Sequence, residues 1–590
     1  MLRGIAGVEV RERGGTGAES YVSIRGASPG QTLVLIDGVR VGDPASTEGA
    51  VDFGNLVAPD IERIEVLRGP QSALYGSDAM GGVINIITRR GGGPLKRSVT
   101  LEGGSYGTLH SRGAVSGGDD NFNYSFAIDA LHTDGFPRYG YRIGRPLTYG
   151  FGAGPLPPLP WGDPTNKGGA SGRVSYRLSD SARIEGGFFA ADNSIRFDNP
   201  SASLPGDVFS ARNHSRATFL QGYARLTTDA FDGALQNQFT VFGNLTDRNN
   251  YQTEACFDLL FNAFDCRNGY RGGRRGAEYQ GDLKVGTFGI LTFGLRTETE
   301  TASTSQSPAP TGTFTPISAQ QTTNSVYAQH KVSIGERLDV TYGGRIDAVA
   351  NGPTFATWRT TASYRLNDEG TRLHASAGTG AKTPSLFQRF SQYGSAALNP
   401  EQSVGFDAGV EQRLFNNRLT LDVTGFDNRY RNLIGFDTVA SCTAAQIFGC
   451  YYNVGRAVTR GVEASADAVI IPDELKARAT YTFMYARDLT LNTPIYQRPR
   501  NQASASVVYT GIAKWELEGR VTFVGTRLDF ASPPVNLAPY AKLDVFANYK
   551  LNDSISLFGR IENLTNARYS EVFNYGVAGR SYYAGLKATW

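Results

Sequence analysis

Residues 22–88 contain the stretch that decides the fold: VSIRGASPGQTLVLIDGVRVGDPAST at 22–47 and IERIEVLRGPQSALYGSDAMGGVINIIT at 61–88. Three short runs, Thr32–Ile36, Ile61–Leu67 and Val83–Ile87, are rich in Val, Ile or Leu and are bounded by Gly, Pro, Asp or Asn. Such runs and boundaries are typical of strands. Gly-rich turns are too frequent for a helical domain, so the sequence predicts a small mixed β domain, with Arg25 and Arg68 each directly before a glycine.

Four motifs follow one another in this stretch: IRG at 24–26, VLIDGVR at 34–40, RGP at 68–70 and YGSDAMGGVINIIT at 75–88. Together they resemble the plug of TonB-dependent outer-membrane transporters. The resemblance implies an all-β membrane protein, a 22-stranded antiparallel transmembrane β-barrel with an N-terminal mixed α/β plug in its lumen. The plug would occupy residues 1–92 and the barrel, with long extracellular loops, residues 93–590.

The composition alone resembles that of a soluble protein, with 40% hydrophobic residues and a mean hydropathy of −0.29. No stretch approaches the roughly 18 apolar residues of a spanning helix. A transmembrane barrel exposes only every second residue to lipid, so modest hydropathy is compatible with it. The 71 glycines, 29 tyrosines and 33 phenylalanines fit a large β protein with aromatic girdles. A net charge of +3 gives no support to nucleic-acid binding.

Beyond residue 93, apolar or small residues alternate with polar ones, as at 337–348, 542–551 and 582–590. Period two places the two sets on opposite faces of a strand. A β-sandwich would alternate too, and a secreted β-rich adhesin is the alternative of a different class. Strands of about ten residues and alternating short and long connections favour the barrel. Short turns are expected at 415–417 and 551–553, and long loops at 135–168, 192–214 and 435–453. By resemblance, Trp590 is a barrel-insertion signal.

The four cysteines form two close pairs in irregular polar and aromatic segments. A zinc site usually has CxxC spacing and histidine partners, whereas the five histidines are scattered elsewhere. We therefore expect two disulfides, Cys256–Cys266 and Cys442–Cys450, each within one long loop, and an oxidising compartment.

Arg25 and Arg68 lie in segments that a barrel lumen would enclose, where a charged side chain needs a partner. The alternative is that both are solvated loop arginines. In the transporters that this chain resembles, plug arginines pair with barrel glutamates, and the matching positions are Glu401 (NPE at 399–401) and Glu463 (GVE at 461–463). The resemblance thus implies a latch of Arg25, Arg68, Glu401 and Glu463, because the guanidinium fork suits a carboxylate.

The resemblance also assigns substrate contacts to two plug loops, at 27–31 and 42–47. Recognition residues usually lie on loops of a rigid scaffold, although Pro and Gly would produce plain turns here as well. Aromatic residues of the long loops (Tyr139, Tyr141, Tyr393, Tyr451 and Tyr452) are expected either in the ligand cup or in the girdles. The expected substrate-binding residues are Ser28, Pro29, Gly30, Gln31, Asp43, Pro44, Ala45, Ser46 and Thr47.

Within the family, the plug motifs, ALHTDGF at 130–136 and the segment 561–590 most resemble the cobalamin (vitamin B12) transporters. Those transporters order their loops with calcium held by aspartates, and Asp192, Asp198 and Asp207 occupy a comparable region. Three aspartates with carbonyl oxygens would suffice for calcium, and solvated loop acids are the alternative. Beyond this possible structural calcium, no cofactor is expected.

A ferric siderophore and haem are the alternative ligands. A ferric siderophore stays open, because siderophore receptors share nearly all of these motifs. Haem transporters carry a histidine between an FRAP and an NPNL motif. The matching stretch, 381–402, has no histidine and reads AKTP in place of FRAP, so haem is disfavoured.

No enzyme is expected. Gly103–Gly107 (GGSYG) matches the nucleophile-elbow pattern and His110 is nearby, but the elbow requires a strand followed by a helix, and here an alternating β segment follows. P-loop and HExxH motifs are absent from the sequence. The resemblance implies transport of a bulky, scarce nutrient, cobalamin or another corrinoid first and a ferric siderophore second, across the bacterial outer membrane and its lipid.

The same resemblance implies the TonB–ExbB–ExbD inner-membrane complex as the energy-supplying partner. The chain opens with LRGIAGVEV at 2–10, which resembles the interior of the plug. The export signal and the TonB box are therefore expected to be missing from this sequence. Either the sequence is shortened at its N-terminus or the protein does not couple to TonB in the usual way.

Overall fold

We describe the fold from a computed structural model of the chain. It describes residues 2–57, 60–142, 162–198, 211–258, 262–310, 314–437, 439–440, 442–443, 446, 449–530 and 533–590, together with the backbone of 148–149 and 152–153. Among these residues, no helix is both long and apolar enough to cross a membrane.

The N-terminal domain contains a hairpin and a four-stranded sheet. The hairpin pairs β1 (Val8–Glu12) with β2 (Ser20–Ile24), and the sheet has the order β4-β3-β6-β5. Its strands are β3 (Thr32–Ile36), β4 (Val39–Val41), β5 (Ile61–Arg68) and β6 (Gly82–Thr88), which confirms the three predicted runs as strands. β3 and β6 are parallel and the other pairs antiparallel. The short helical turns are η1 (Leu2–Gly4), η2 (Pro29–Gln31), η3 (Phe53–Asn55) and α1 (Ser72–Tyr75).

A hydrophobic core holds the hairpin and the sheet together. Ile24, Ile36 and Ile84 are each at most 1% exposed and belong to one buried cluster. Burial of an isoleucine side chain stabilises a fold by roughly 1.5–3 kcal/mol. The same cluster includes Phe189 and Phe219 of the surrounding wall, so the core continues from the N-terminal domain into the barrel.

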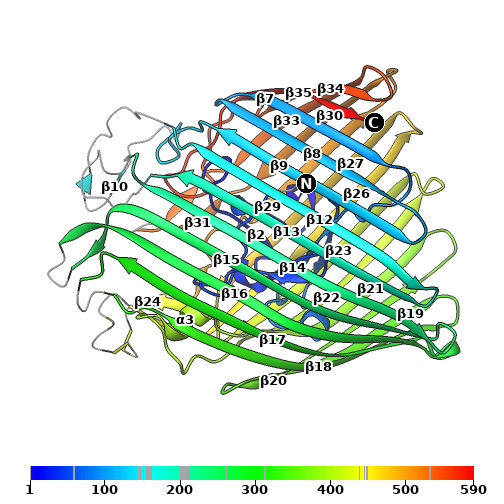
Figure 1. The fold of residues 1–590 in the computed structure, drawn as a ribbon, viewed down its shortest axis with the longest axis horizontal. Coiled ribbons are helices and arrows are strands. Elements are labelled where there is room, and N and C mark those ends of the chain that lie inside the picture. The colour runs from blue at the N-terminus through cyan, green and yellow to red at the C-terminus, as the bar shows by residue number, and fades with distance from the viewer. Residues whose placement is uncertain are drawn as a thin grey trace.

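Most of the remaining strands form a closed antiparallel barrel around this domain (Figure 1). The barrel contains twenty-three named strands of the described residues; β28 has only two residues, which leaves the predicted twenty-two. β35 pairs with β7 and closes the ring, for example at Leu586 and Leu101. The barrel strands are β7 (Lys96–Gly104), β8 (Thr108–Gly118), β9 (Phe122–Thr133), β12 (Thr165–Ser179), β13 (Ala182–Arg196), β14 (His214–Ala230), β15 (Leu235–Phe257), β16 (Ala263–Lys284), β17 (Ile290–Ser307), β18 (Ser318–Ile334), β19 (Leu338–Val349), β20 (Thr354–Arg365), β21 (Thr371–Lys382), β22 (Glu401–Leu414), β23 (Leu419–Arg431), β26 (Arg456–Ile471), β27 (Leu475–Asp488), β28 (Thr493–Pro494), β29 (Asn501–Tyr509), β30 (Trp515–Val524), β33 (Tyr540–Lys550), β34 (Ile555–Glu562) and β35 (Ser581–Thr589).

Smaller elements lie in the connections at one end of the barrel. They are the helix α3 (Leu386–Phe390), the hairpins β24 (Ile434–Asp437) with β25 (Cys450–Asn453) and β31 (Arg527–Asp529) with β32 (Val535–Leu537), and the short pair β10 (Thr148–Tyr149) with β11 (Gly152–Ala153). At the opposite end, η4 (Gly286–Phe288) lies in a turn. We call the first the long-loop end, at the left in Figure 1, and the second the short-turn end.

The predicted alternation along the strands is confirmed by burial. In β19, Arg345 and Asp347 point into the lumen and are 5% and 2% exposed, whereas Tyr342 and Ile346 are each 49% exposed. Along the outer wall, large apolar side chains such as Leu109, Ile128 and Leu295 are more than half exposed. A continuous band of this kind suits lipid and would be a liability in water.

The predicted strand length of about ten residues is wrong for one side of the barrel. β15 has 23 residues and β16 has 22. These strands rise beyond a tilted bilayer crossing and form the wall of the long-loop end, as the long green strands of Figure 1 show. The predicted short turns are confirmed, with Phe415, Asn416 and Asn417 in the left-handed region between β22 and β23.

Candidate functional site

A buried ionic cluster joins the N-terminal plug to the barrel wall. Arg25 donates from Nε to Glu463 Oε1 at 2.9 Å and from Nη2 to Oε2 at 3.0 Å, and its Nη1 donates to Asp407 Oδ2 at 2.9 Å. Arg68 Nη1 donates to Glu463 Oε2 at 2.7 Å. The side chains of Arg25 and Glu463 are 3% and 1% exposed. We call Arg25, Arg68, Asp407 and Glu463 the Glu463 cluster.

Two backbone features allow this close approach. Arg25 has a φ of 50°, which aims its side chain from the end of β2 toward the wall. Gly7 has a φ of 77°, and a Cβ atom there would lie 2.0 Å from Glu463 Oε1. Only glycine accepts both the conformation and the contact. The plug therefore presents a bare backbone to the carboxylate.

The structure brings together three of the four predicted latch residues and leaves Glu401 apart from them. Glu401 accepts hydrogen bonds from Gln31 Nε2 at 3.1 Å and from the Ile434 backbone at 2.8 Å, and lies 3.8 Å from Lys382 Nζ. It therefore contacts the outer plug loop and not the arginines. Asp407, on β22, takes the second carboxylate position and also accepts from Ser376 Oγ. Sequence reasoning missed it, because one acid on an alternating strand carries no motif.

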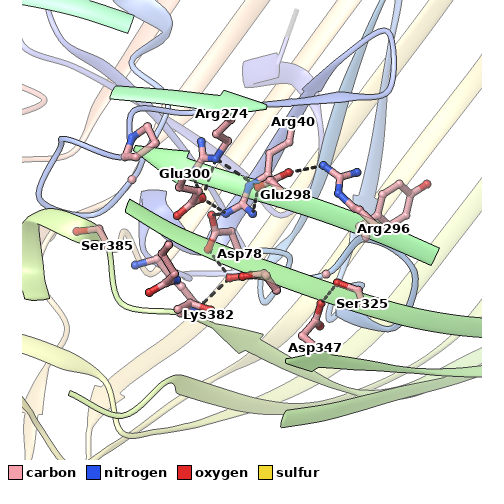
Figure 2. Close-up of a pocket in the computed structure, with 18 of the residues that line it drawn as sticks. Arg40, Asp78, Arg274, Arg296, Glu298, Glu300, Ser325, Asp347, Lys382 and Ser385 are labelled. Carbon is pink, nitrogen blue, oxygen red and sulfur yellow. Dashed lines mark hydrogen bonds and ion pairs between the residues drawn. The ribbon is translucent and has the colours of Figure 1, made fainter. Parts of the chain in front are cut away.

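A second ionic cluster, which the sequence did not reveal, lies on another side of the plug (Figure 2). Arg40, on β4, pairs with Asp78 and with Glu298 of β17, the latter at 3.2 Å. Arg274 of β16 pairs with Glu300 at 2.6 Å, and Arg296 pairs with Glu298 at 2.5 Å and Glu278 at 3.0 Å. We call these seven residues the Arg40 cluster, and all of them except Glu278 line a cavity of about 40 Å³.

A larger cavity of about 560 Å³ lies between the plug loops and the long-loop end of the barrel. We call it the cup. Five of the predicted substrate-binding residues line it: Ser28, Pro29, Ala45, Ser46 and Thr47. The barrel contributes Tyr270, Phe387, Tyr496 and Phe530 among others, and the rings of Tyr496 and Phe530 stack with centroids 4.3 Å apart. The cup thus combines aromatic surface with backbone-rich plug apices.

The other four predicted residues support the cup without lining it. Gln31 binds the Ser28 backbone and Glu401, and Asp43 accepts from the Ala45 backbone at 2.9 Å and from Arg248 at 3.1 Å. Gly30 packs against the Glu48 backbone, where a Cβ would lie 2.3 Å from the carbonyl oxygen. Pro44 lines the Arg40 cavity instead. Gln31, Asp43 and Gly30 therefore stabilise the conformation of the two plug loops.

Aromatic side chains also pack behind the cup. Tyr451 packs against Phe387 and Phe436, and Tyr393 against Phe436, so both stabilise the β24–β25 hairpin. Tyr139 is 4% exposed and lies away from the cup lining. Both predicted disulfides form, with Cα–Cα distances of 6.0 Å for Cys256–Cys266 and 5.5 Å for Cys442–Cys450. They join β15 to β16 and close the β24–β25 loop.

Two of the three aspartates of the predicted calcium site are described, and each has its own partners. Asp192 accepts from Arg216 at 3.1 Å and Thr218 at 2.7 Å and lies between the buried residues Ala191 and Asn193, so it faces outward. Asp198 is buried beyond β13 and accepts from the Tyr139 backbone at 2.7 Å. Asp207 lies outside the described residues. The calcium site stays a prediction.

Asp198 shares its buried position with Asp163. Burial, and next the negative charge of Asp163, raise the pKa of Asp198 to about 8, and burial also raises the pKa of Asp163. Asp163 Oδ2 accepts from the Arg138 backbone at 3.0 Å, while the Arg138 side chain donates to Thr16, Thr165 and other oxygens. Two adjacent carboxyls in such a position share a proton at neutral pH.

Comparisons with known proteins agree with this architecture. A family model described as "TonB dependent receptor-like, beta-barrel" matches residues 117–564, and the TonB-dependent Receptor Plug Domain matches residues 1–83. The chain is 28% identical to the vitamin B12 transporter BtuB of Photobacterium profundum, over 99% of this chain and 88% of that protein.

Two solved structures share the fold. The siderophore receptor PirA from Acinetobacter baumannii superposes with a TM-score of 0.83 at 18% identity, covering 100% of this chain and 95% of PirA. A mutant of the ferric enterobactin receptor PfeA from Pseudomonas aeruginosa, in complex with enterobactin, gives 0.80 at 19% identity, covering 100% and 96%. With the family model spanning most of the barrel, the chain belongs to the TonB-dependent receptors, which are outer-membrane transporters and not enzymes.

Proposed function

We propose that this TonB-dependent receptor takes up a corrinoid, with cobalamin as the first candidate. The observation that carries the proposal is the likeness to a vitamin B12 transporter, which extends over 99% of the chain and so includes both the plug and the loops. The siderophore receptors PirA and PfeA share the fold at lower identity, and likeness at that level speaks for the fold alone.

The cup is the proposed entry site. A bulky ligand would rest on the plug apices at Ser28–Pro29 and Ala45–Thr47, with the aromatic side chains of the barrel packed around it. Tyr and Phe rings provide large, rigid contact surfaces at a low cost in conformational entropy. No chemical step is needed, since binding at this cavity and passage through the barrel complete the transport.

We also propose that the Glu463 cluster acts as the latch and that the TonB–ExbB–ExbD complex supplies the energy to open it. Arg25, which is 3% exposed, has two carboxylate partners in the wall, so withdrawal of the plug must break charge-assisted hydrogen bonds in a dry environment. Separating such a pair is costly, and an energy source that pulls the plug would meet this cost.

The test is the binding of cyanocobalamin to the detergent-purified protein, with and without calcium, beside a panel of ferric siderophores. The informative variant is Thr47→Trp, because Thr47 is exposed at the floor of the cup. Thr287→Trp, in the exposed turn at the short-turn end, is the matched control.

We expect cyanocobalamin to bind the wild type and Thr287→Trp equally and to bind Thr47→Trp at least tenfold more weakly. Binding of a ferric siderophore without binding of cobalamin would contradict the corrinoid proposal and would leave the assignment as a transporter unchanged. An effect of calcium on binding would support the loop site at Asp192, Asp198 and Asp207, and equal binding with and without calcium would remove it.

A further inference from the structure

Two arginines line the cup, one from the plug and one from the barrel. Arg11 belongs to β1 of the plug, directly across the hairpin from Tyr21, which also lines the cup. Arg498 belongs to the connection between β28 and β29 of the barrel. A ligand resting on the plug loops would therefore lie between a plug guanidinium and a barrel guanidinium.

Arg498 is held firmly without a carboxylate partner. Its Nε donates to the Gly26 carbonyl at 2.8 Å and its Nη2 to the Ala27 carbonyl at 2.8 Å, with weaker contacts from Nη1 to the Tyr496 and Gln497 carbonyls. These oxygens fix the plane of the guanidinium and carry no formal charge themselves. Among the described residues, no ion pair involves Arg498.

Arg11 differs from the other plug and wall arginines of the cup. Arg13 pairs with Glu19 at 2.7 Å, and Arg248 pairs with Asp43 at 3.1 Å. Within the described part of the chain, the Arg11 side chain makes neither an ion pair nor a hydrogen bond, although it is only half-exposed. Its polar head is thus available to a ligand in the cup.

The charges around Arg11 act in opposite senses. Burial first, and then the positive charge of Arg498, lower the pKa of Arg11, while Glu9 and Glu48 oppose this effect through space. Burial raises the pKa of the neighbouring Glu9 carboxyl, and the positive charges of Arg498 and Arg11 oppose this effect. Two like charges held in a confined space favour an anion between them.

We propose that Arg11 and Arg498 form an anion subsite at the floor of the cup, which recognises negatively charged oxygen atoms on the transported ligand. Guanidinium groups bind phosphate, carboxylate and catecholate oxygens through paired, charge-assisted hydrogen bonds. The inference rests on the proposed function, since it specifies which part of the ligand the cup selects. A corrinoid would present its phosphodiester there, and a ferric siderophore its anionic iron-binding groups.

The experiment compares ligand pairs that differ in this group. Cyanocobalamin, which carries a phosphodiester, is compared with dicyanocobinamide, which lacks it. Ferric enterobactin, a trianion, is compared with the neutral ferrichrome. The test variant is Arg11→Gln, because the side chain makes no hydrogen bond within the described structure that its removal would break. Arg63→Gln, on β5 of the plug and outside the cup lining, is the control, and Arg11→Lys restores the charge.

For whichever ligand pair binds, we expect Arg11→Gln to lower the affinity for the anionic member by at least tenfold. The affinity for its neutral counterpart should change by less than twofold. Arg63→Gln should leave both unchanged, and Arg11→Lys, which restores the charge but not the paired donors, should recover part of the loss. Equal losses for both members, or no loss for the anionic one, would overturn the subsite.

A ligand-independent measurement separates the subsite from the proposed function. Inorganic tripolyphosphate should raise the Tm of the wild type more than that of Arg11→Gln, because a ligand that binds the folded state stabilises it. If no corrinoid or siderophore binds but this difference is present, the function proposal fails and the subsite is kept. If tripolyphosphate stabilises both proteins equally, the subsite is excluded.

Discussion

The plug meets the barrel through two buried ionic clusters that are built differently. In the Glu463 cluster, one carboxylate serves two arginines and Asp407 serves only Arg25. In the Arg40 cluster, four acids serve three arginines, and each arginine has at least two acidic partners. Removing one partner from a buried pair leaves an uncompensated charge. The first cluster therefore depends on a single residue, whereas the second is redundant.

The largest effect is expected from Glu463→Gln. Arg68 loses its carboxylate and Arg25 keeps only Asp407, so opening of the plug near residues 20–26 should become easier by about 3–5 kcal/mol. Amide hydrogen exchange at 20–26 measures this free energy. Glu474→Gln, in an exposed turn, is the control. Unchanged exchange at 20–26 would show that Glu463 does not hold the plug.

A smaller effect is expected from Glu298→Gln. Arg40 retains Asp78, Arg274 retains Glu300 and Arg296 retains Glu278. Loss of one shared acceptor should then cost about 1–3 kcal/mol, read from amide exchange in β4. A loss as large as that of Glu463→Gln would contradict the redundancy.

The Asp163–Asp198 pair sharpens the comparison, because within the described residues neither carboxyl forms an ion pair with an arginine. The pKa of Asp198 is raised from the ordinary carboxyl range to about 8, so the folded state holds the proton more tightly than the unfolded state. The pair's contribution to stability is full below about pH 4 and is lost as the pH rises through about 8.

Exchange of the amides at 134–139 should accordingly speed up between pH 5 and pH 9 beyond the intrinsic pH effect. Asp198→Asn, which cannot ionise, should remove most of that extra dependence. A pH profile identical in the wild type and in Asp198→Asn would show that the carboxyl pair does not titrate in this range.

The smallest effect is expected from Arg63→Gln on β5. Arg63 pairs with Glu62 and Glu65, but its side chain is 52% exposed, and solvent screens such pairs. Exchange across the plug sheet should stay within experimental scatter. A clear loss of protection would mean that ionic contacts of the plug matter even where water reaches them.

The two clusters also show what could be predicted from the sequence. Arg25, Arg68 and Glu463 lie in recognisable motifs, so the family resemblance was enough to predict their contact. The predicted pairing of Glu401 with the plug arginines was wrong. Its motif indicates a place on β22 but not which plug residue lies opposite, and in the structure that residue is Gln31. The Arg40 cluster combines β4 with β16 and β17, and such a contact depends on barrel register, which no local pattern encodes.

The same distinction holds for the strands and the cup. Period-two alternation predicted the strands, because lipid on one face and the lumen on the other impose it, and the connection lengths and the family resemblance favoured a barrel over a sandwich. The full lengths of β15 and β16 were missed. Beyond the bilayer both faces of a strand contact water, so apolar and polar residues no longer alternate there. The plug apices were predicted from their motifs, whereas Arg498 lies in a loop whose path to the cup follows from tertiary structure.

The seam between β35 and β7 has a consequence for how the barrel is made. Arg97 and Trp590 exchange backbone hydrogen bonds at 2.8 and 3.0 Å, so the first and last strands of the ring are neighbours. Every other barrel strand can pair with one made just before it, but this junction must wait for the whole wall. Until then, two strand edges stay open to unintended partners. The ring can therefore close only after its C-terminal strand has been made.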